Sequence, residues 1–354
     1  MADTSIIDAL NGQARICTEF GAPFCGALIG LAAQDVAAGG PAAGLLAPWR
    51  NAERREIVAD AATLRLLGAF HDLALSGLAP ELTRAFPGDV AAGDAAAAWR
   101  VLRGLIPQHA ARLSSFMTQE PQTNEVGRSA FLMPGLQQVA RVTGLPLRCF
   151  EIAASAGLNI SWDAYRYQLG GAAWGDAASS VKLAPNWRGT APVLGPVQVV
   201  ERAGCDRKPI DLGDADQRQR LRAYVWADQR DRFTRLSAAI DLAVARSVHV
   251  EAKDAGDFVR TRAAPQAGAA TIVYHSVFWS YMPRAAQDSL RALLNERGTQ
   301  ATRDAPFAWL AAEPTNEKPD QFEIRLTTWP SGAESLLGLA HPHGAWVEWF
   351  GAGA

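Results

Sequence analysis

Residues Leu147–Asn159 constrain the fold more than any other segment of the chain. The run Leu147–Ile152 is mostly apolar and carries an acid at Glu151, and the residues after it, 153–157, are all small. Such a run is typical of a buried parallel strand, and small residues are typical of a tight turn against a ligand. Gly157 can also take a positive φ that bulkier residues resist. Because ligands bind outside the carboxyl ends of strands in open α/β sheets, we expect a small ligand at this turn.

The spacing of the small residues after Glu151 narrows the choice of ligand. Ala153, Ser155 and Gly157 stand at alternate positions, and only the last is a glycine. A dinucleotide turn needs more glycines, because pyrophosphate must approach bare backbone N–H groups closely. S-adenosylmethionine has no phosphate, and class I methyltransferases bind it with a looser acid-x-Gly-x-Gly-x-Gly turn. The chain fits that turn with two substitutions, and an ordinary turn after a buried strand is the structural alternative.

The order of predicted elements changes near residue 145. Residues 1–145 carry apolar residues at helical spacing and no strand run, which predicts an all-α N-terminal cap region. Residues 146–354 alternate strands with helices, with an inserted hairpin at about 162–190. We therefore predict an α/β fold with a Rossmann-like, mostly parallel sheet of methyltransferase type. The specific elements expected are strands at 147–153, 197–200, 248–251, 271–277 and 307–312, a terminal antiparallel pair at 322–329 and 346–349, and a long helix at 217–246.

Segments spread over nearly the whole chain resemble a family of bacterial proteins classified as a domain of unknown function. They are residues 64–71, 122–128, 151–159, 204–206 and 224–229. The family is grouped with Rossmann-like, methyltransferase-type folds, so the resemblance implies that fold and carries no activity with it. The chain departs from the family at Ala227, where the family prefers proline.

Cofactor contacts are expected at the strand ends. Glu201 follows the predicted strand 197–200, and an acid there would accept hydrogen bonds from a ribose diol, although a solvated strand-end glutamate is the alternative. S-adenosylmethionine is the cofactor that we predict for this site. Its expected contacts are Glu151, Ala153, Ser155, Gly157, Asn159 and Glu201.

An aromatic run follows the fourth predicted strand. His275 lies at a position that faces the transferred methyl group in methyltransferases, and a histidine could take a proton from the substrate. Trp279 and Tyr281 could wall a cationic sulfonium or a flat substrate through cation–π contact. We therefore predict His275 as the catalytic residue, and a hydrogen-bonded core histidine is the structural alternative.

The polar segment 123–128 lies in the helical half of the chain. Thr123 could cap a helix, and Glu125 could pair with Arg128, which are structural roles. In the functional alternative, Asn124 and Arg128 face the cleft. The substrate contacts that we predict are Trp279, Tyr281, Asn124 and Arg128.

Two other classes of function stay open. The segment 153–157 is one residue from Gly-x-Ser-x-Gly, the nucleophile elbow of α/β-hydrolases, so a serine esterase could use Ser155. Its partners could be Asp254 or Asp257 with His275, His341 or His343. A non-catalytic small-ligand-binding protein is the third interpretation, because two glycines of the methyltransferase turn are missing.

Composition excludes several partners. The net charge is −2, from 34 basic and 36 acidic residues, so no nucleic-acid footprint is expected. The N-terminus has no signal-peptide hydrophobic region, and no apolar run is long enough for a bilayer. The cysteines at 17, 25, 149 and 205 lack the spacing of a metal site. We expect a cytoplasmic protein with a small-molecule substrate, no metal and no membrane partner, and the oligomeric state cannot be predicted.

Overall fold

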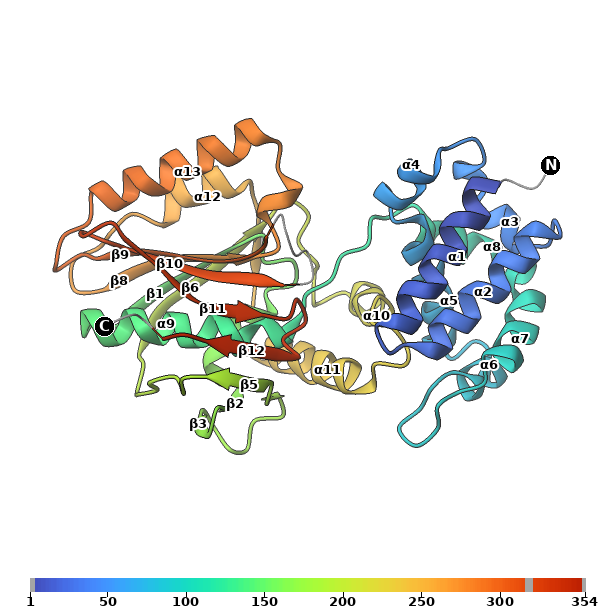
Figure 1. The fold of residues 1–354 in the computed structure, drawn as a ribbon, viewed down its shortest axis with the longest axis horizontal. Coiled ribbons are helices and arrows are strands. Elements are labelled where there is room, and N and C mark those ends of the chain that lie inside the picture. The colour runs from blue at the N-terminus through green and yellow to red at the C-terminus, as the bar shows by residue number, and fades with distance from the viewer. Residues whose placement is uncertain (1–3, 316–320, 352–354) are drawn as a thin grey trace. The chain divides into compact units, whose positions relative to one another are not determined.

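The structure is a computed structural model that describes residues 4–315 and 321–351. Its contacts divide the chain into two compact units, which are described separately (Figure 1). Unit 1 comprises Met1–Thr123 and Asp214–Ser237, and unit 2 comprises Asn124–Gly213 and Ala238–Ala354. This division differs from a single boundary at residue 145. The helix α9 (Ser129–Thr143) packs on the sheet of unit 2, and the chain returns to unit 1 after residue 213.

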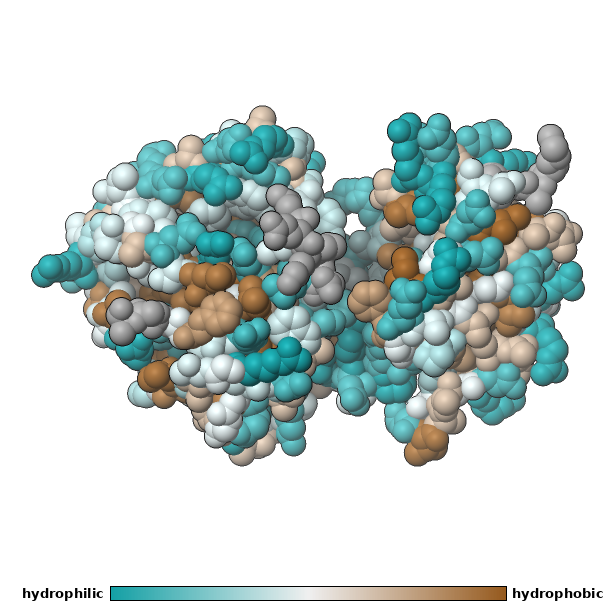
Figure 2. Space-filling view, viewed as in Figure 1, coloured by the Kyte–Doolittle hydropathy of each residue, from teal (hydrophilic) through white to brown (hydrophobic). Residues whose placement is uncertain are grey.

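Every regular element that the structure describes in unit 1 is a helix. Its longest helices bury apolar faces in one core, while the visible surface of each unit is mixed, with hydrophilic side chains between smaller hydrophobic patches (Figure 2). The α-helices are α1 (Thr4–Glu19), α2 (Pro23–Ala37), α3 (Ala42–Leu45), α4 (Arg54–Ala59), α5 (Ala62–Leu75), α6 (Pro80–Ala85), α7 (Ala95–Gln108), α8 (Ala110–Met117), α10 (Ala215–Ala223) and the first part of α11 (Arg230–Ala245).

The predicted helix over residues 217–246 is wrong, because residues 224–229 are not helical between α10 and α11. The reason is a pair of long-range contacts. Nδ1 of His71 on α5 lies 3.0 Å from the carbonyl oxygen of Val225. The Asp228 carboxylate accepts hydrogen bonds from Phe24 N–H (2.8 Å) and Cys25 N–H (3.0 Å), which caps α2. These bonds to other helices replace the helical bonds of the segment.

Unit 2 is built on a nine-stranded sheet, in which five neighbouring strands are all parallel and confirm a mixed α/β fold with a mostly parallel sheet. Its strand order is β5-β12-β11-β10-β9-β8-β1-β6-β7. The strands are β1 (Leu147–Ile152), β5 (Asn186–Gly189), β6 (Val199–Asp206), β7 (Val250–Ala252), β8 (Ala270–Ser276), β9 (Phe307–Pro314), β10 (Phe322–Trp329), β11 (Ala333–Ala340) and β12 (Trp346–Trp349).

The path of the chain creates a switch point between β1 and β8. From β1 the chain moves outward to β6 and β7, and then returns to the other side of β1 to form β8 and β9. The helices α12 (Ala255–Arg262) and α13 (Arg284–Thr299) cover one face of this sheet and α9 the other (Figure 1). Phe150 and Ile152 of β1 pack in the core below α12 and α13. Since side chains alternate along a strand, Glu151 points to the opposite face.

Two predicted β features differ from the structure. The terminal strands β10 and β12 do not pair directly, because β11 lies between them and is antiparallel to both. A bulge at Leu337 breaks the alternation of β11 and conceals it in the sequence. The inserted hairpin is β2 (Arg166–Leu169) with β3 (Ala172–Trp174), and β4 (Lys182–Leu183) joins them in a separate small sheet.

Candidate functional site

The turn after β1 has an unusual backbone. Ala153, Ser155 and Gly157 all lie in the left-handed region, with φ of 56°, 55° and 74°. Val277, directly after β8, also has a positive φ of 53°. A left-handed conformation costs a non-glycine residue about 1–3 kcal/mol, and such strain concentrates at functional sites. The small residues of the predicted turn are therefore needed for its conformation.

The strained residues gather at one place in the sheet. Ser155 follows the carboxyl end of β1 and Val277 that of β8, and these two strands flank the switch point. Open α/β sheets bind ligands outside the carboxyl ends of their strands at such a point. The position of the turn agrees with the site expected from the sequence.

Bonds from distant segments hold the turn in place. Ser155 N–H donates to Oδ2 of Asp206 (2.9 Å), and Ala154 N–H donates to the Cys205 carbonyl (2.9 Å). On the other side, Leu158 N–H donates to Oδ1 of Asn124 (2.9 Å). Asp206 lies at the end of β6, next to β1, and is a site residue that the sequence analysis did not identify. Because β6 contains charged residues and a glycine, its apolar pattern does not show where the strand ends.

Two polar side-chain atoms at the turn have no hydrogen-bond partner among the described residues. They are Oε2 of Glu151 and Oγ of Ser155, and both are buried. Burial raises the pKa of the Glu151 carboxyl well above its usual value, and Asp206 raises it further, whereas Arg128 and Asn159 lower it. A buried polar group without a partner is costly, so these atoms indicate where a ligand would bond.

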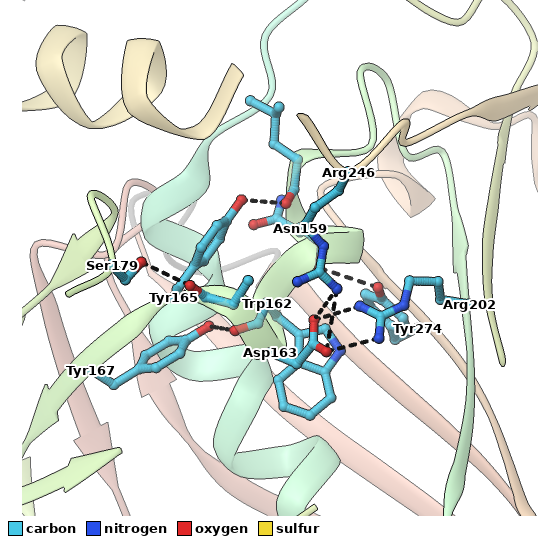
Figure 3. Close-up of polar contacts among 11 residues, drawn as sticks. Asn159, Trp162, Asp163, Tyr165, Tyr167, Ser179, Arg202, Arg246 and Tyr274 are labelled. Atoms are coloured by element: carbon cyan, nitrogen blue, oxygen red, sulfur yellow. Dashed lines mark hydrogen bonds and ion pairs between the residues drawn. The ribbon is translucent and has the colours of Figure 1, made fainter. Parts of the chain in front are cut away.

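The segment behind the turn is firmly supported (Figure 3). It is the helix η3 (Leu158–Ala164), and the hydroxyl of Tyr274 donates to the Asn159 carbonyl (3.3 Å) at its start. Asp163 forms ion pairs with both Arg202 and Arg246 at its end. The Asn159 side chain accepts a bond from Ser129 Oγ (2.6 Å), so it stabilises the fold beside Glu151. A rigid support of this kind preorganises a binding site.

Residues 124–128, which we name the bridging segment, connect several loops at this edge. Asn124 bonds the turn, and Nη1 of Arg128 donates to the carbonyl and hydroxyl oxygens of Ser276, the last residue of β8 (both 3.4 Å). A Cβ at Gly127 would collide with the His343 carbonyl oxygen, so the segment also passes close to the loop after β11. The structure therefore brings Asn124 to the turn, and Arg128 to the end of β8 and to the Pro342 carbonyl (3.2 Å). Both of these predicted residues bond protein backbone.

Gly157 contacts protein side chains. A Cβ there would lie 2.8 Å from Val250 and 2.9 Å from Val248. Its positive φ also requires glycine. Packing and conformation both explain this glycine, and a larger residue would first disturb the fold.

The predicted end of the second strand is wrong, and this changes the position of Glu201. The strand β6 continues to Asp206, so Glu201 lies near its beginning. Its carboxylate pairs with Nε of Arg148 at 2.8 Å. Asp206, and not Glu201, is the acid at the carboxyl end of β6.

His275 lies away from the turn, and this position does not support its predicted role as the catalytic residue. Glu151 is opposite Tyr274 in the pairing of β1 with β8, so His275 points to the other face of the sheet. Its ring is fully buried, with Nδ1 2.7 Å from Glu313 Oε1, and Nε2 accepts from the Trp309 indole N–H (3.0 Å). Both nitrogens have structural partners, so His275 is a hydrogen-bonded core residue.

The predicted aromatic substrate contacts, Trp279 and Tyr281, follow His275 closely in the chain. Trp279 stacks on the His275 ring at 5.5 Å between centroids, and the guanidinium of Arg291 lies over Trp279 at 5.2 Å. The Tyr281 side chain is 78% exposed. The structure does not bring Trp279 to the strained turn, because it packs on the α13 face of the sheet.

The described residues form no serine triad around Ser155. The nitrogens of His275 bond Glu313 and Trp309, and Ser155 Oγ has no partner. Asp254 caps α12 through Gly256 N–H (2.8 Å). The other candidates are also engaged: Asp257 pairs with Arg260, and His341 Nδ1 accepts from His343 N–H.

Two kinds of feature are absent from the described part of the chain. No group of three or more His, Cys, Asp or Glu residues there could hold a metal ion. None of its helices combines the length and apolar character that crossing a membrane requires.

Comparisons with other proteins concern the whole chain. No curated protein and no solved structure matches it. A family model matches residues 8–349, which include both units and the complete candidate site. The chain therefore belongs to the family described as uncharacterised protein conserved in bacteria (DUF2332).

Proposed function

We propose that the turn after β1 binds S-adenosylmethionine or a close relative, and that the protein is a methyltransferase acting on a small molecule. One observation carries the proposal. The three alternate small residues after Glu151 are all left-handed, at the carboxyl end of a strand beside the switch point. That conformation lets the backbone approach a ligand closely, as the three glycines do in a methyltransferase turn. The parallel order β7-β6-β1-β8-β9 supports a methyltransferase-type sheet.

The charges at the turn favour a ligand without phosphate. The Asp206 carboxylate already accepts the Ser155 N–H, which is the kind of donor that a pyrophosphate would need. Glu151 adds a second carboxyl group beside the turn, and its oxygen Oε2 lacks a partner. The charge of Asp206 favours a cationic ligand and repels a phosphate. A bound cation would also favour the ionised form of the Glu151 carboxyl, whose pKa is raised by burial.

The residues present fit S-adenosylmethionine. Glu151 would accept a bond from its amino group, and Asp206 would take the role predicted for Glu201 near the ribose. Ala153 and Ser155 leave room beside the backbone, and the bound cofactor would supply an electrophilic methyl group. Both carboxyl groups at the turn, Glu151 and Asp206, are assigned to the cofactor, so the proposed part of these residues is to bind and orient. The expectation that unit 1 caps this site stays a prediction.

Titration calorimetry and thermal melting with S-adenosylhomocysteine test the proposal. A ligand at about 100 times its dissociation constant adds about 2.7 kcal/mol to the stability of a protein that binds it. We expect the wild type to bind, Glu151→Leu to lose binding, and Glu323→Gln, a carboxylate change on β10, to bind normally. A folded wild type that gives neither heat nor a melting shift would refute the proposal.

Two further measurements separate the other interpretations. Transfer of a labelled methyl group to small molecules of a cell extract distinguishes an enzyme from a binding protein. Labelling of Ser155 by a fluorophosphonate would instead support a serine esterase.

A further inference from the structure

The bridging segment connects the two loops that flank the switch point. Its first residue, Asn124, is 7% exposed, and its Oδ1 accepts the N–H of the fully buried Leu158. Its last residue, Arg128, donates to the carbonyl oxygen of Ser276. One short piece of chain therefore contacts both sides of the proposed ligand site.

Each contact lies close to a strained residue. Leu158 lies three residues after Ser155, and Ser276 directly precedes Val277. Strained backbone persists only where its surroundings fix it. If Asn124 were shortened, the N–H of Leu158 would be buried without an acceptor, and the turn would move to satisfy it.

The segment between these contacts has little freedom to shift. The Glu125 carboxylate accepts Gly127 N–H (2.9 Å), and Val126 is buried. Gly127 has no space for a Cβ against the His343 carbonyl. A stiff connection transmits a displacement at one end to the other.

We propose that Asn124 and Arg128 are positioning residues, which together set the separation of the two loops across the ligand site. Asn124 fixes the turn after β1, Arg128 fixes the loop after β8, and neither needs to touch the ligand. The identity of the ligand rests on the proposed function, whereas the positioning role concerns the loops themselves.

Binding measurements test the effect on the site. Asn124→Ala should weaken S-adenosylhomocysteine binding about tenfold, as expected for loss of a buried hydrogen bond that holds a binding loop. Asn124→Asp keeps an acceptor oxygen and should restore binding. Arg128→Lys keeps the charge but loses the planar fork, and should weaken binding as Asn124→Ala does. The matched control is Thr143→Ala, which removes a part-buried side-chain bond to the Val139 carbonyl (2.8 Å) at the C-terminal end of α9 in the same unit.

Amide hydrogen exchange tests the positioning role without a ligand. Asn124→Ala and Arg128→Lys should each raise exchange in both loops, 153–158 and 276–278, while Thr143→Ala changes neither. An increase in exchange that is confined to the loop next to each mutation would overturn the proposal. Binding of S-adenosylhomocysteine with wild-type affinity by both Asn124→Ala and Arg128→Lys would also overturn it. If the wild type fails to bind S-adenosylhomocysteine but exchange rises in both loops, the proposed function falls and the positioning role stands.

Discussion

The backbone N–H of Ser155 donates a hydrogen bond to the Asp206 carboxylate, 2.9 Å away, and Ser155 itself has a φ of 55°. Ser155 thus has a backbone conformation that favours glycine, and a charged acceptor at the end of the neighbouring strand holds it there. Natural proteins break such local rules mainly at functional sites. Substitution of Ser155 therefore tests whether the conformation of this turn lowers the stability of the protein.

Replacing Ser155 by glycine should stabilise the protein. Glycine adopts a positive φ without strain, and the buried Ser155 hydroxyl has no partner to lose. We expect Ser155→Gly to raise the free energy of unfolding by about 1 kcal/mol, measured by urea denaturation. The control is Ala156→Gly, whose position lacks a positive φ and should lose about 0.5–1 kcal/mol. Equal losses in both variants would show that the turn is not strained.

The Glu151 carboxyl should make stability depend on pH. Burial raises its pKa well above the usual value, so the folded state keeps a proton that the unfolded chain releases above about pH 4.3. Stability therefore falls as the pH rises from about 4.3 through the folded-state pKa, by at most about 1.4 kcal/mol per pH unit. Glutamine does not titrate, so Glu151→Gln should remove this contribution.

Urea denaturation at a series of pH values measures the contribution of the Glu151 carboxyl to stability. Wild type and Glu151→Gln should be similar near about pH 4, and the variant should be more stable near about pH 8. A constant difference over that range would mean that the carboxyl group titrates normally. The Glu323→Gln variant serves as the control, since Glu323 pairs with Arg325 on the surface of the sheet.

Local patterns predicted the strand β1, the turn and its small residues, because these depend on neighbouring residues in the chain. The apolar run before Glu151 and the small residues after it specify a buried strand and a close turn without further information. The parallel part of the sheet was likewise predictable from alternating elements.

Features that depend on distant partners were not predictable. The end of β6 is concealed because Glu201 and Arg202 pair with other charged residues. The face of the sheet on which the His275 side chain lies depends on the register of β8. A shift of one residue would move that side chain to the opposite face. The bond from Leu158 N–H to Asn124 joins residues 34 positions apart, and no local pattern indicates it.

The partners of His275 predict a structural role for it. His275→Ala would leave the Trp309 indole N–H and one oxygen of Glu313 without their partner. We expect it to lower the free energy of unfolding by about 2–4 kcal/mol and to leave S-adenosylhomocysteine affinity unchanged. Trp309→Phe removes one hydrogen bond and should cost about 1 kcal/mol. If His275→Ala instead lost binding while its melting temperature was unchanged, His275 would be part of the binding site.

Asp228 should stabilise unit 1 through α2. Ala22, which precedes that helix, supplies no side-chain cap, and the Asp228 carboxylate accepts both Phe24 N–H and Cys25 N–H. Asp228→Ala should therefore lower the free energy of unfolding by about 1–2 kcal/mol, measured by urea denaturation with circular dichroism. Asp228→Asn keeps one acceptor and should lose less. The exposed Asp231 is the control, because Asp231→Ala should change stability by less than about 0.5 kcal/mol. Equal effects at positions 228 and 231 would show that the cap contributes nothing to unit 1.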